Sequence, residues 1–194
     1  MRKLTYYIAL TIDGFIAAPD GTADFYPIGE DMTQYLTTEY PETLPTHIRR
    51  MLGFDDAANR HFDTVLMGGA TYRLALDEGN TSPYGHLRQY VFSRAESPSP
   101  DPDVEFVATD PLARVRELKA EDGGQGVYLC GGGELAGLLL PEIDELVTKV
   151  YPVVAGSGIP MFATDFAGPV PFALTDSRTF GNGAAVLTYE RVRD

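Results

Sequence analysis

The 194-residue sequence has no tryptophan, a single cysteine (Cys130), and far fewer basic than acidic residues. One cysteine excludes an intrachain disulfide and a cysteine-rich zinc site. The formal net charge of −13 disfavours nucleic acid, whose binding depends on Lys and Arg side chains that neutralise phosphates. It disfavours anionic membrane surfaces for the same reason. The three histidines are irregularly spaced, so no metal site is expected.

Long apolar segments are also missing. No run approaches the roughly 18–20 residues that a membrane-spanning helix needs. The N-terminal stretch MRKLTYYIALTIDG starts with basic residues but lacks a long apolar region followed by a cleavage-site pattern, so no signal peptide is expected. Length and ordinary composition predict one soluble, cytoplasmic domain that covers residues 1–194.

Strand and helix patterns alternate through the middle of the chain. Residues 4–16 (LTYYIALTIDGFI) predict a buried strand that runs into a turn at Asp13-Gly14. The other predicted strands are 64–67, 89–93, 104–108, the run from 127 and 144–154, and the predicted helices are pieces of 33–62 broken by Pro41 and Pro45, a helix from Thr71, the segment 110–119 and a helix after the glycines at 131–133. A polar, proline-rich loop is expected at 93–102.

The chain ends in a predicted β-hairpin. Asn182-Gly183 lies between two β-rich runs, which is typical of a two-residue hairpin turn. Strands that alternate with helices form parallel sheets covered on both faces. The expected fold is therefore α/β, with a mixed, mostly parallel sheet, helices on both faces and a C-terminal antiparallel hairpin.

Two segments have the same order of features: a strand, then glycines, then a helix start. They are TVLMGGATY at 64–72 and VYLCGGGEL at 127–135. Ligands of open α/β sheets bind beyond the carboxyl ends of strands, and helix N-termini favour phosphate. Two such segments suggest one ligand with two anionic parts, such as a dinucleotide. The alternative is that the glycines serve tight turns or close strand–helix packing. Neither segment matches the G-x-G-x-x-G or Walker A motifs.

These motifs resemble those of the dihydrofolate reductase-like superfamily. The segments LTYYIALTIDGFIA, VLMGGATYRL, YVFSR, VYLCGGGELAGLLL and DELVTKVYPVVAGSGIPMF occur in the order seen there. They are most similar to the branch related to the C-terminal reductase domain of riboflavin-biosynthesis bifunctional deaminase/reductases. The resemblance implies a three-layer fold, NADPH as cofactor, a small-molecule substrate and a homodimer.

The resemblance also implies which residues hold the cofactor. They are Ala9, Ile16 and Ala17 at the nicotinamide; Gly68, Gly69, Ala70 and Thr71 on one side of the pyrophosphate; Ser93 and Arg94 near the adenosine 2′-phosphate; and Gly131, Gly132, Gly133, Glu134 and Leu135 at the pyrophosphate, the nicotinamide ribose and the helix start. By the same resemblance, the Gly131–Gly132 bond is expected to be cis.

One departure from the family pattern bears on cofactor choice. The common form of the first glycine segment is G-R-x-T-[YW]-E, whereas this chain has Gly68-Gly69-Ala70-Thr71-Tyr72-Arg73. The arginine after the first glycine is absent, and this leaves NADH open beside NADPH. Arg73 is a candidate to replace it in part, although its direction on a helix would differ.

The implied reaction is hydride transfer to an imine or carbonyl carbon, for which the protein orients the groups and relays a proton. Asp13, in the turn after the first strand, and Asp24, in TADFYP, are the candidate catalytic carboxylates. A turn-forming role for Asp13 and a solvated loop charge at Asp24 are the alternatives. Glu30 or Asp31 is a weaker candidate by spacing, and Phe25 and Tyr26 are candidates to stack on a flat substrate.

The sequence therefore favours an NAD(P)H-dependent reductase acting on a pteridine- or pyrimidine-like heterocycle or a related small molecule. Two alternatives stay open. One is a nucleotide-binding module that kept the fold without catalysis, and the other is a true dihydrofolate reductase. The substrate itself is set by loops such as 18–30, which a fold-level resemblance does not specify.

Overall fold

The computed structural model describes residues 1–94, 100–165 and 168–193. Its main sheet has eight strands in the order β5-β4-β3-β6-β1-β7-β10-β9. These strands are β1 (Leu4–Thr11), β3 (Phe62–Gly68), β4 (Arg88–Phe92), β5 (Val104–Val107), β6 (Gly126–Gly131), β7 (Glu145–Tyr151), β9 (Phe172–Thr179) and β10 (Ala185–Arg191). The first six in the spatial order are parallel, and β10 is antiparallel to both β7 and β9. The predicted mixed, mostly parallel sheet is confirmed.

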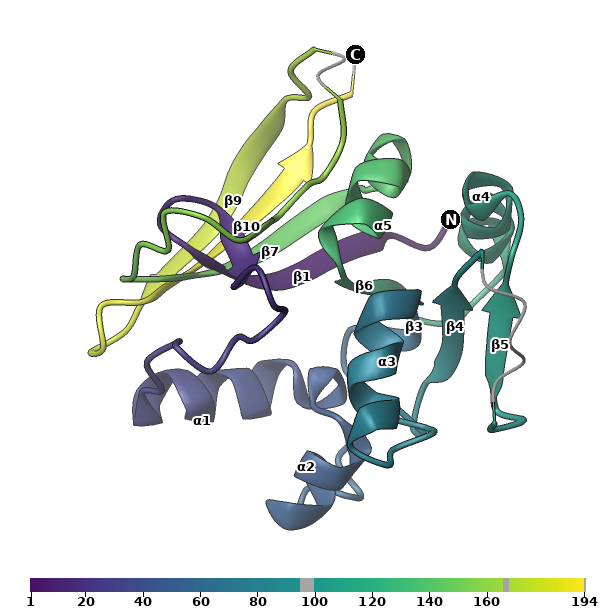
Figure 1. Cartoon of the computed structure of the whole chain (residues 1–194), viewed down its shortest axis with the longest axis horizontal. Coiled ribbons are helices and arrows are strands. Elements are labelled where there is room, and N and C mark those ends of the chain that lie inside the picture. Colours follow the sequence, from purple (N-terminus) through teal and green to yellow (C-terminus); the bar gives the residue numbers. More distant parts are fainter. Residues whose placement is uncertain (95–99, 166–167, 194) are drawn as a thin grey trace.

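Helices cover both faces of this sheet (Figure 1). They are α1 (Glu30–Glu39), α2 (Thr46–Met51), α3 (Gly69–Asp77), α4 (Pro111–Ala120) and α5 (Gly133–Leu139), with 3-10 turns η1 (Pro41–Thr43) and η2 (Leu140–Glu142). Met32 of α1 and Tyr72 of α3 belong to one buried cluster, whereas Val115 of α4 and Leu139 of α5 belong to another. The three-layer arrangement predicted from the sequence is therefore confirmed.

Local signals place the start of α4 correctly. The Asp110 carboxylate accepts a hydrogen bond from the Ala113 N–H at 3.0 Å, and Pro111 is the first helical residue. Proline costs nothing there because its missing N–H would have no partner inside the helix. The hydroxyl or carboxylate of an N-cap residue typically contributes about 1 kcal/mol. This helix packs Val115 and Leu118 into the core on the α5 side.

The predicted first strand is broken after Thr11. The Thr11 carbonyl accepts the Gly14 N–H at 3.0 Å, and its hydroxyl accepts the Phe15 N–H at 3.0 Å. These bonds close a turn in which Gly14 has a φ of 85°, a conformation that favours glycine. The chain then leaves the main sheet as β2 (Phe15–Ala17), which pairs with β8 (Ile159–Pro160).

The predicted length of the hairpin turn, two residues, is too short by one residue. The Phe180 N–H bonds to the Ala184 carbonyl at 3.0 Å, so the loop consists of the three residues 181–183. Gly183 has a φ of 82° and its N–H bonds to the Phe180 carbonyl at 2.9 Å. This is the three-residue hairpin that ends in a left-handed glycine. The predicted helix start at Thr71 is also late, since α3 begins at Gly69.

The segment after β8 crosses α5 at two glycines. A Cβ on Gly133 would clash with the Pro160 carbonyl oxygen, and a Cβ on Gly137 would lie 2.5 Å from the Ala163 carbonyl oxygen. Main-chain atoms cannot move aside as the end of a flexible side chain can. The Ala163 N–H also bonds to the Gly133 carbonyl at 3.0 Å. These contacts hold the chain after β8 against the helix that follows the glycines.

Replacing Gly137 with alanine tests this packing by the sign of its effect. Alanine in an unobstructed helix position stabilises by up to about 1 kcal/mol relative to glycine. We expect Gly137→Ala to destabilise instead, by about 1–3 kcal/mol, because the methyl group meets the Ala163 main chain. Urea unfolding measures the change. Leu138→Ala, on the exposed side of the same helix, is the control and should change stability little. A more stable G137A protein would contradict the packing.

Candidate functional site

The two glycine segments lie side by side at the carboxyl ends of β3 and β6. Met67 is the register partner of Gly131, and a Cβ on Gly68 would lie 3.4 Å from the Gly131 oxygen and the Gly132 nitrogen. Gly131 has a φ of 133°, and its bond to Gly132 is cis, as the resemblance implies. The segments, 63 residues apart in the chain by their numbers (131 − 68), therefore form one continuous backbone surface.

Both helices that leave this surface start without a capping side chain. Gly68 is the N-cap of α3 and Gly132 is the N-cap of α5. Glycine has no oxygen to offer to the first-turn N–H groups, in contrast to Asp110 at the start of α4. The first N–H groups of a helix have no partner within it, and the positive end of its dipole favours an anion. The longer of the two helices, α3, thus directs free donors at this edge.

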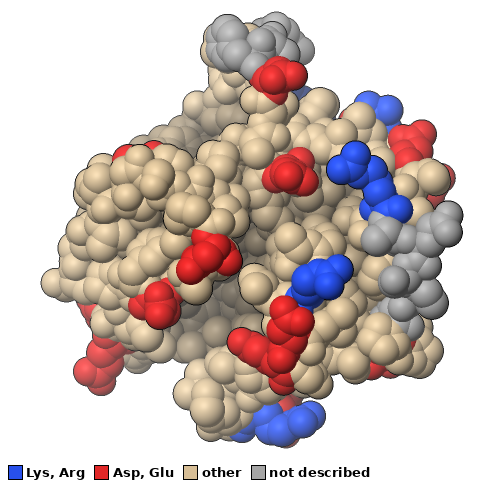
Figure 2. Space-filling model, in the orientation of Figure 1, with Lys and Arg blue, Asp and Glu red and all other residues tan. Residues whose placement is uncertain are grey.

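Other predicted cofactor residues gather at the same place. A Cβ on Gly132 would lie 3.7 Å from Thr71 Oγ1 and 4.0 Å from Ile16 Cδ1, and a Cβ on Gly68 would lie 3.7 Å from Leu135 Cβ. Residues from β2, α3 and α5 therefore meet around the cis glycine pair. Figure 2 shows that the surface is hollowed near the centre of this view, where α3, α5 and the segment after β2 approach one another in Figure 1.

Ser93 and Arg94 follow the next strand along. Phe92 is the register partner of Gly68, and a Cβ on Gly69 would lie 3.0 Å from Ser93 Oγ. Arg94 is exposed. The predicted 2′-phosphate residues therefore lie beside the first glycine segment. Residues 95–99 of the predicted loop lie outside the described residues.

The third glycine of the triple has a separate explanation. Gly133 is buried, and the Pro160 carbonyl occupies the place of its side chain. Its neighbour Glu134 is exposed in the first turn of α5. Close packing of the main chain, which is the alternative reading of the glycines, thus applies to Gly133, whereas the partly exposed Gly132 lies beside the partly exposed Gly68. The cofactor role of Gly133 and Glu134 stays a prediction.

The predicted nicotinamide contacts lie on β1 and β2. Ala9 lies in the sheet as the register partner of Lys149 on β7, and Ala17 is buried at the end of β2. The Tyr26 hydroxyl donates to the Phe15 carbonyl at 3.0 Å. This bond ties the loop after β2 to the strand and places an aromatic side chain beside the candidate site.

Asp13 holds a turn. Its Oδ1 accepts hydrogen bonds from the Thr11 hydroxyl at 2.6 Å and the Ala155 N–H at 3.1 Å, and its Oδ2 accepts the Gly156 N–H at 2.7 Å. The bond from Thr11, followed by those from the backbone, lowers the pKa of Asp13 to about 2. The carboxylate stays ionised at neutral pH and has no proton to donate. These contacts favour the turn-forming alternative for Asp13.

The other carboxylate candidates also lie away from the glycines or at the surface. Asp24 is exposed and has no hydrogen-bond partner among the described residues. The neighbouring Phe25 and Tyr26 rings lie 4.6 Å apart. Asp31 accepts the Gly181 N–H at 2.8 Å and thereby fastens α1 to the β9–β10 turn. Asp31 therefore has a structural role, and Asp24 stays a prediction.

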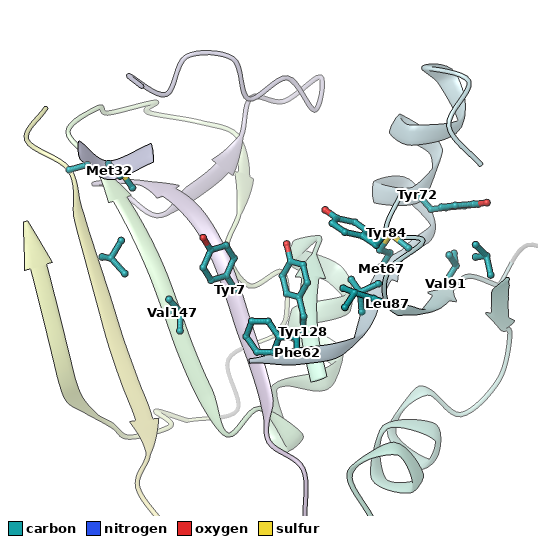
Figure 3. Packing of buried hydrophobic residues seen from close by; sticks show 14 of the residues in the cluster. Tyr7, Met32, Phe62, Met67, Tyr72, Tyr84, Leu87, Val91, Tyr128 and Val147 are labelled. Carbon is teal, nitrogen blue, oxygen red and sulfur yellow. The ribbon is translucent and has the colours of Figure 1, made fainter. Parts of the chain in front are cut away.

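The sequence analysis missed one basic residue beside the candidate site, Lys149 on β7. The Nζ atom of Lys149 lies 4.0 Å from the centre of the Tyr7 ring. Loss of hydration lowers the pKa of Lys149 to about 8. Figure 3 shows Tyr7 and Tyr128 standing on neighbouring strands with their hydroxyls pointing the same way. The Tyr84 hydroxyl lies 3.5 Å from the Cys130 sulfur, directly before the cis glycines. The lysine inside the apolar run ELVTKVY was the signal that could have revealed this group.

No described helix is both long and apolar enough to span a bilayer. The described part of the chain also contains no group of three or more His, Cys, Asp and Glu side chains arranged to hold a metal ion.

Comparison with known proteins gives a consistent family. The model of the family described as RibD C-terminal domain matches residues 2–186. The uncharacterized protein YwjB of Bacillus subtilis (strain 168) is 30% identical over 192 residues, which covers 98% of this chain and 98% of that protein.

Solved structures share the fold at low identity. A putative riboflavin biosynthesis protein from Shewanella sp. PV-4 has a TM-score of 0.72 and 22% identity, with 98% of this chain and 99% of that chain covered. A dihydrofolate reductase from Enterococcus faecalis, complexed with NADP(H) and RAB-propyl, has a TM-score of 0.64 and 13% identity, with 97% and 96% covered. The resemblance to dihydrofolate reductase-like proteins is therefore confirmed at the level of the fold.

The lowered pKa of Lys149 has a consequence for stability. Its ordinary pKa is 10.5, so between about pH 8 and 10.5 the unfolded chain binds more protons than the folded chain. The penalty for burying the charge is complete below pH 8 and is relieved as the pH rises through this window. Relative to a Lys149→Met variant, the wild type should gain on the order of 1–3 kcal/mol from pH 8 to 10.5, as each pKa unit contributes about 1.4 kcal/mol.

Urea unfolding of both proteins across this pH range measures the difference. Lys3→Met is the matched control, because the hydrogen bond that Lys3 donates to Glu190 raises the pKa of Lys3. Its comparison with wild type should show no such gain. A constant difference between wild type and K149M from pH 8 to 10.5 would show that Lys149 is not desolvated.

Proposed function

The chain belongs to the RibD C-terminal domain family, and from this membership we propose that it is an NAD(P)H-dependent reductase. The proposed reaction transfers hydride to a pteridine- or pyrimidine-like heterocycle or a related small molecule. Its fold is of the reductase type, with the dihydrofolate reductase-like arrangement of a covered sheet and terminal hairpin. The Enterococcus faecalis reductase of the same fold was solved with NADP(H), which supports a nicotinamide cofactor for the family.

The observation that carries the proposal is the joined backbone surface of the two glycine segments. Gly68 and Gly132 start helices with no capping side chain, and Gly68 abuts the Gly131–Gly132 peptide. This arrangement fits a ligand whose pyrophosphate lies against glycine and accepts hydrogen bonds from helix N–H groups. An ordinary packing role would account for Gly133 but leaves Gly132, with only contacts of 3.7 Å and longer at its missing Cβ, unexplained.

The residues have distinct roles in this proposal. Gly68, Gly69, Ala70 and Thr71 hold one side of the pyrophosphate, Gly131 to Leu135 hold the other, and Ser93 and Arg94 contact the adenosine 2′-phosphate. Ala9, Ile16 and Ala17 position the nicotinamide, which supplies a hydride when bound. The preference for NADPH over NADH rests on Arg94, with Arg73 exposed on α3 as the other candidate.

A negative charge at the start of α3 should weaken cofactor binding without harming the fold. Ala70 is exposed in the first turn, where a carboxylate favours the helix. In Ala70→Asp the same carboxylate repels a phosphate at close range by about 1–2 kcal/mol. We expect NADPH affinity to fall about tenfold, measured by nicotinamide fluorescence.

Ala70→Asn is the matched uncharged control and should bind NADPH nearly as wild type does. Unfolding midpoints of both variants should equal or exceed that of wild type. Equal affinity in A70D and A70N would remove α3 from the binding site. A wild type that binds neither NADPH nor NADH would overturn the reductase proposal, and binding without oxidation in a screen of heterocycles would favour the nucleotide-binding module.

Cofactor choice gives a second test. Replacing Arg94 with alanine should weaken the binding of NADPH roughly three- to tenfold. The loss is modest because an exposed arginine–phosphate pair is partly screened by solvent. NADH, which has no 2′-phosphate, should bind unchanged. Titrations of both cofactors give the ratio of NADPH affinity to NADH affinity directly. If Arg73→Ala lowers the ratio and R94A does not, the phosphate is read from α3.

A further inference from the structure

Lys149 lies in the middle of the sheet, where an amine is unusual. Its register partners are Ala9 on β1 and Val186 on β10. The side chain is partly buried, and its Nζ lies 4.0 Å from the centre of the Tyr7 ring, a cation–π contact. Because Tyr7 belongs to β1, the lysine side chain extends over β1 toward β6.

The ammonium group has no negative partner among the described residues. Burial has the largest effect on the pKa of Lys149 and lowers it, and the Cys130 side chain has a smaller effect in the opposite direction. An unpaired charge that has lost hydration is unfavourable. An outside group that accepts hydrogen bonds would compensate for this loss, since an ammonium can only donate.

Lys149 also borders the candidate site. Its register partner Ala9 is a predicted nicotinamide contact, and Cys130 directly precedes the cis glycines. The rings of Tyr26 and Tyr151 lie 4.6 Å apart, and the Tyr26 hydroxyl bonds to the Phe15 carbonyl. Aromatic side chains thus line the same region, which suits a flat ring.

The charge of this region is opposite to that expected from the sequence. Asp13 is engaged by the backbone of residues 155 and 156, Asp31 is engaged by Gly181, and Asp24 is exposed. No described carboxylate acts on Lys149. A site with a free ammonium favours carbonyl oxygens and anions, and it disfavours protonated or amino-rich rings, whose donors would face another donor.

We propose that Lys149 is the substrate-binding residue that selects an oxo- or anionic heterocycle, with its ammonium donating to a ring oxygen of the substrate over the Tyr7 ring. The proposal rests on the reductase function proposed above. It assigns the substrate class through one side chain, and it makes a protonated diamino ring a poor ligand.

Two small pyrimidines of opposite character test it. Barbituric acid is an oxo-pyrimidine that is an anion at neutral pH, and 2,4-diaminopyrimidine is an amino-rich base. Calorimetry with the full chain, with and without NADPH, measures the affinity of wild type, Lys149→Met, Lys149→Arg and the surface control Lys3→Met. Circular dichroism and thermal unfolding confirm that each variant folds.

We expect wild type to bind barbiturate at least tenfold more tightly than diaminopyrimidine. K149M should lose this preference, K149R should retain most of it, and K3M should match wild type. Binding of barbiturate to K149M with wild-type affinity would overturn the proposal, as would a wild type that prefers diaminopyrimidine or binds no barbiturate.

The two proposals fail separately. Loss of NADPH binding in wild type would defeat the reductase function, while barbiturate binding that depends on Lys149 would still establish the oxo-anion site. Conversely, NADPH binding with no effect of K149M on either pyrimidine would leave the reductase function standing and remove Lys149 from it.

Discussion

The close approach of two backbone segments at the carboxyl ends of β3 and β6 is the constraint on which the candidate site depends. Gly68 lies so near the Gly131–Gly132 peptide that a side chain there would meet backbone atoms. Parallel pairing of β3 and β6 brings the two segments together, and glycine at each helix start leaves the N–H groups open. A second approach, of the chain after β8 onto Gly133 and Gly137, fixes α5 in place.

Charge is distributed in this protein according to structural need. Acidic residues that looked catalytic hold turns: Asp13 ties the β1–β2 turn to residues 155 and 156, and Asp31 ties α1 to the terminal hairpin. Carboxylates serve this purpose well because they accept several backbone N–H groups at once. A basic group, Lys149, instead borders the candidate site, held against the Tyr7 ring. Electrostatics at the site therefore favours acceptors and anions in spite of the acidic surface.

The fold was predictable from the sequence to a large extent, for local reasons. Asp110 and Pro111 mark a helix start by bonds within one turn, and the alternation in β7 predicts a strand whatever its neighbours are. The predicted elements were wrong where a turn residue sets the direction of the chain. Thr11 and Gly14 end the first strand, and Gly183 adds a residue to the hairpin loop. Such details depend on hydrogen bonds that a pattern of apolar residues does not encode.

The sequence by itself determined the alternation of strands and helices, the two glycine segments and the overall negative charge, because each follows from neighbouring residues or from composition. The tertiary structure alone decided which glycines share a surface. Strand order places Gly68 beside Gly131, whereas Gly133 packs against the main chain of Pro160. It also decided that Asp13 lies among backbone donors and that Lys149 lies over Tyr7. Those roles depend on partners that are distant in the chain, and only the pairing of β1 with β7 and the loop after β7 bring them into contact.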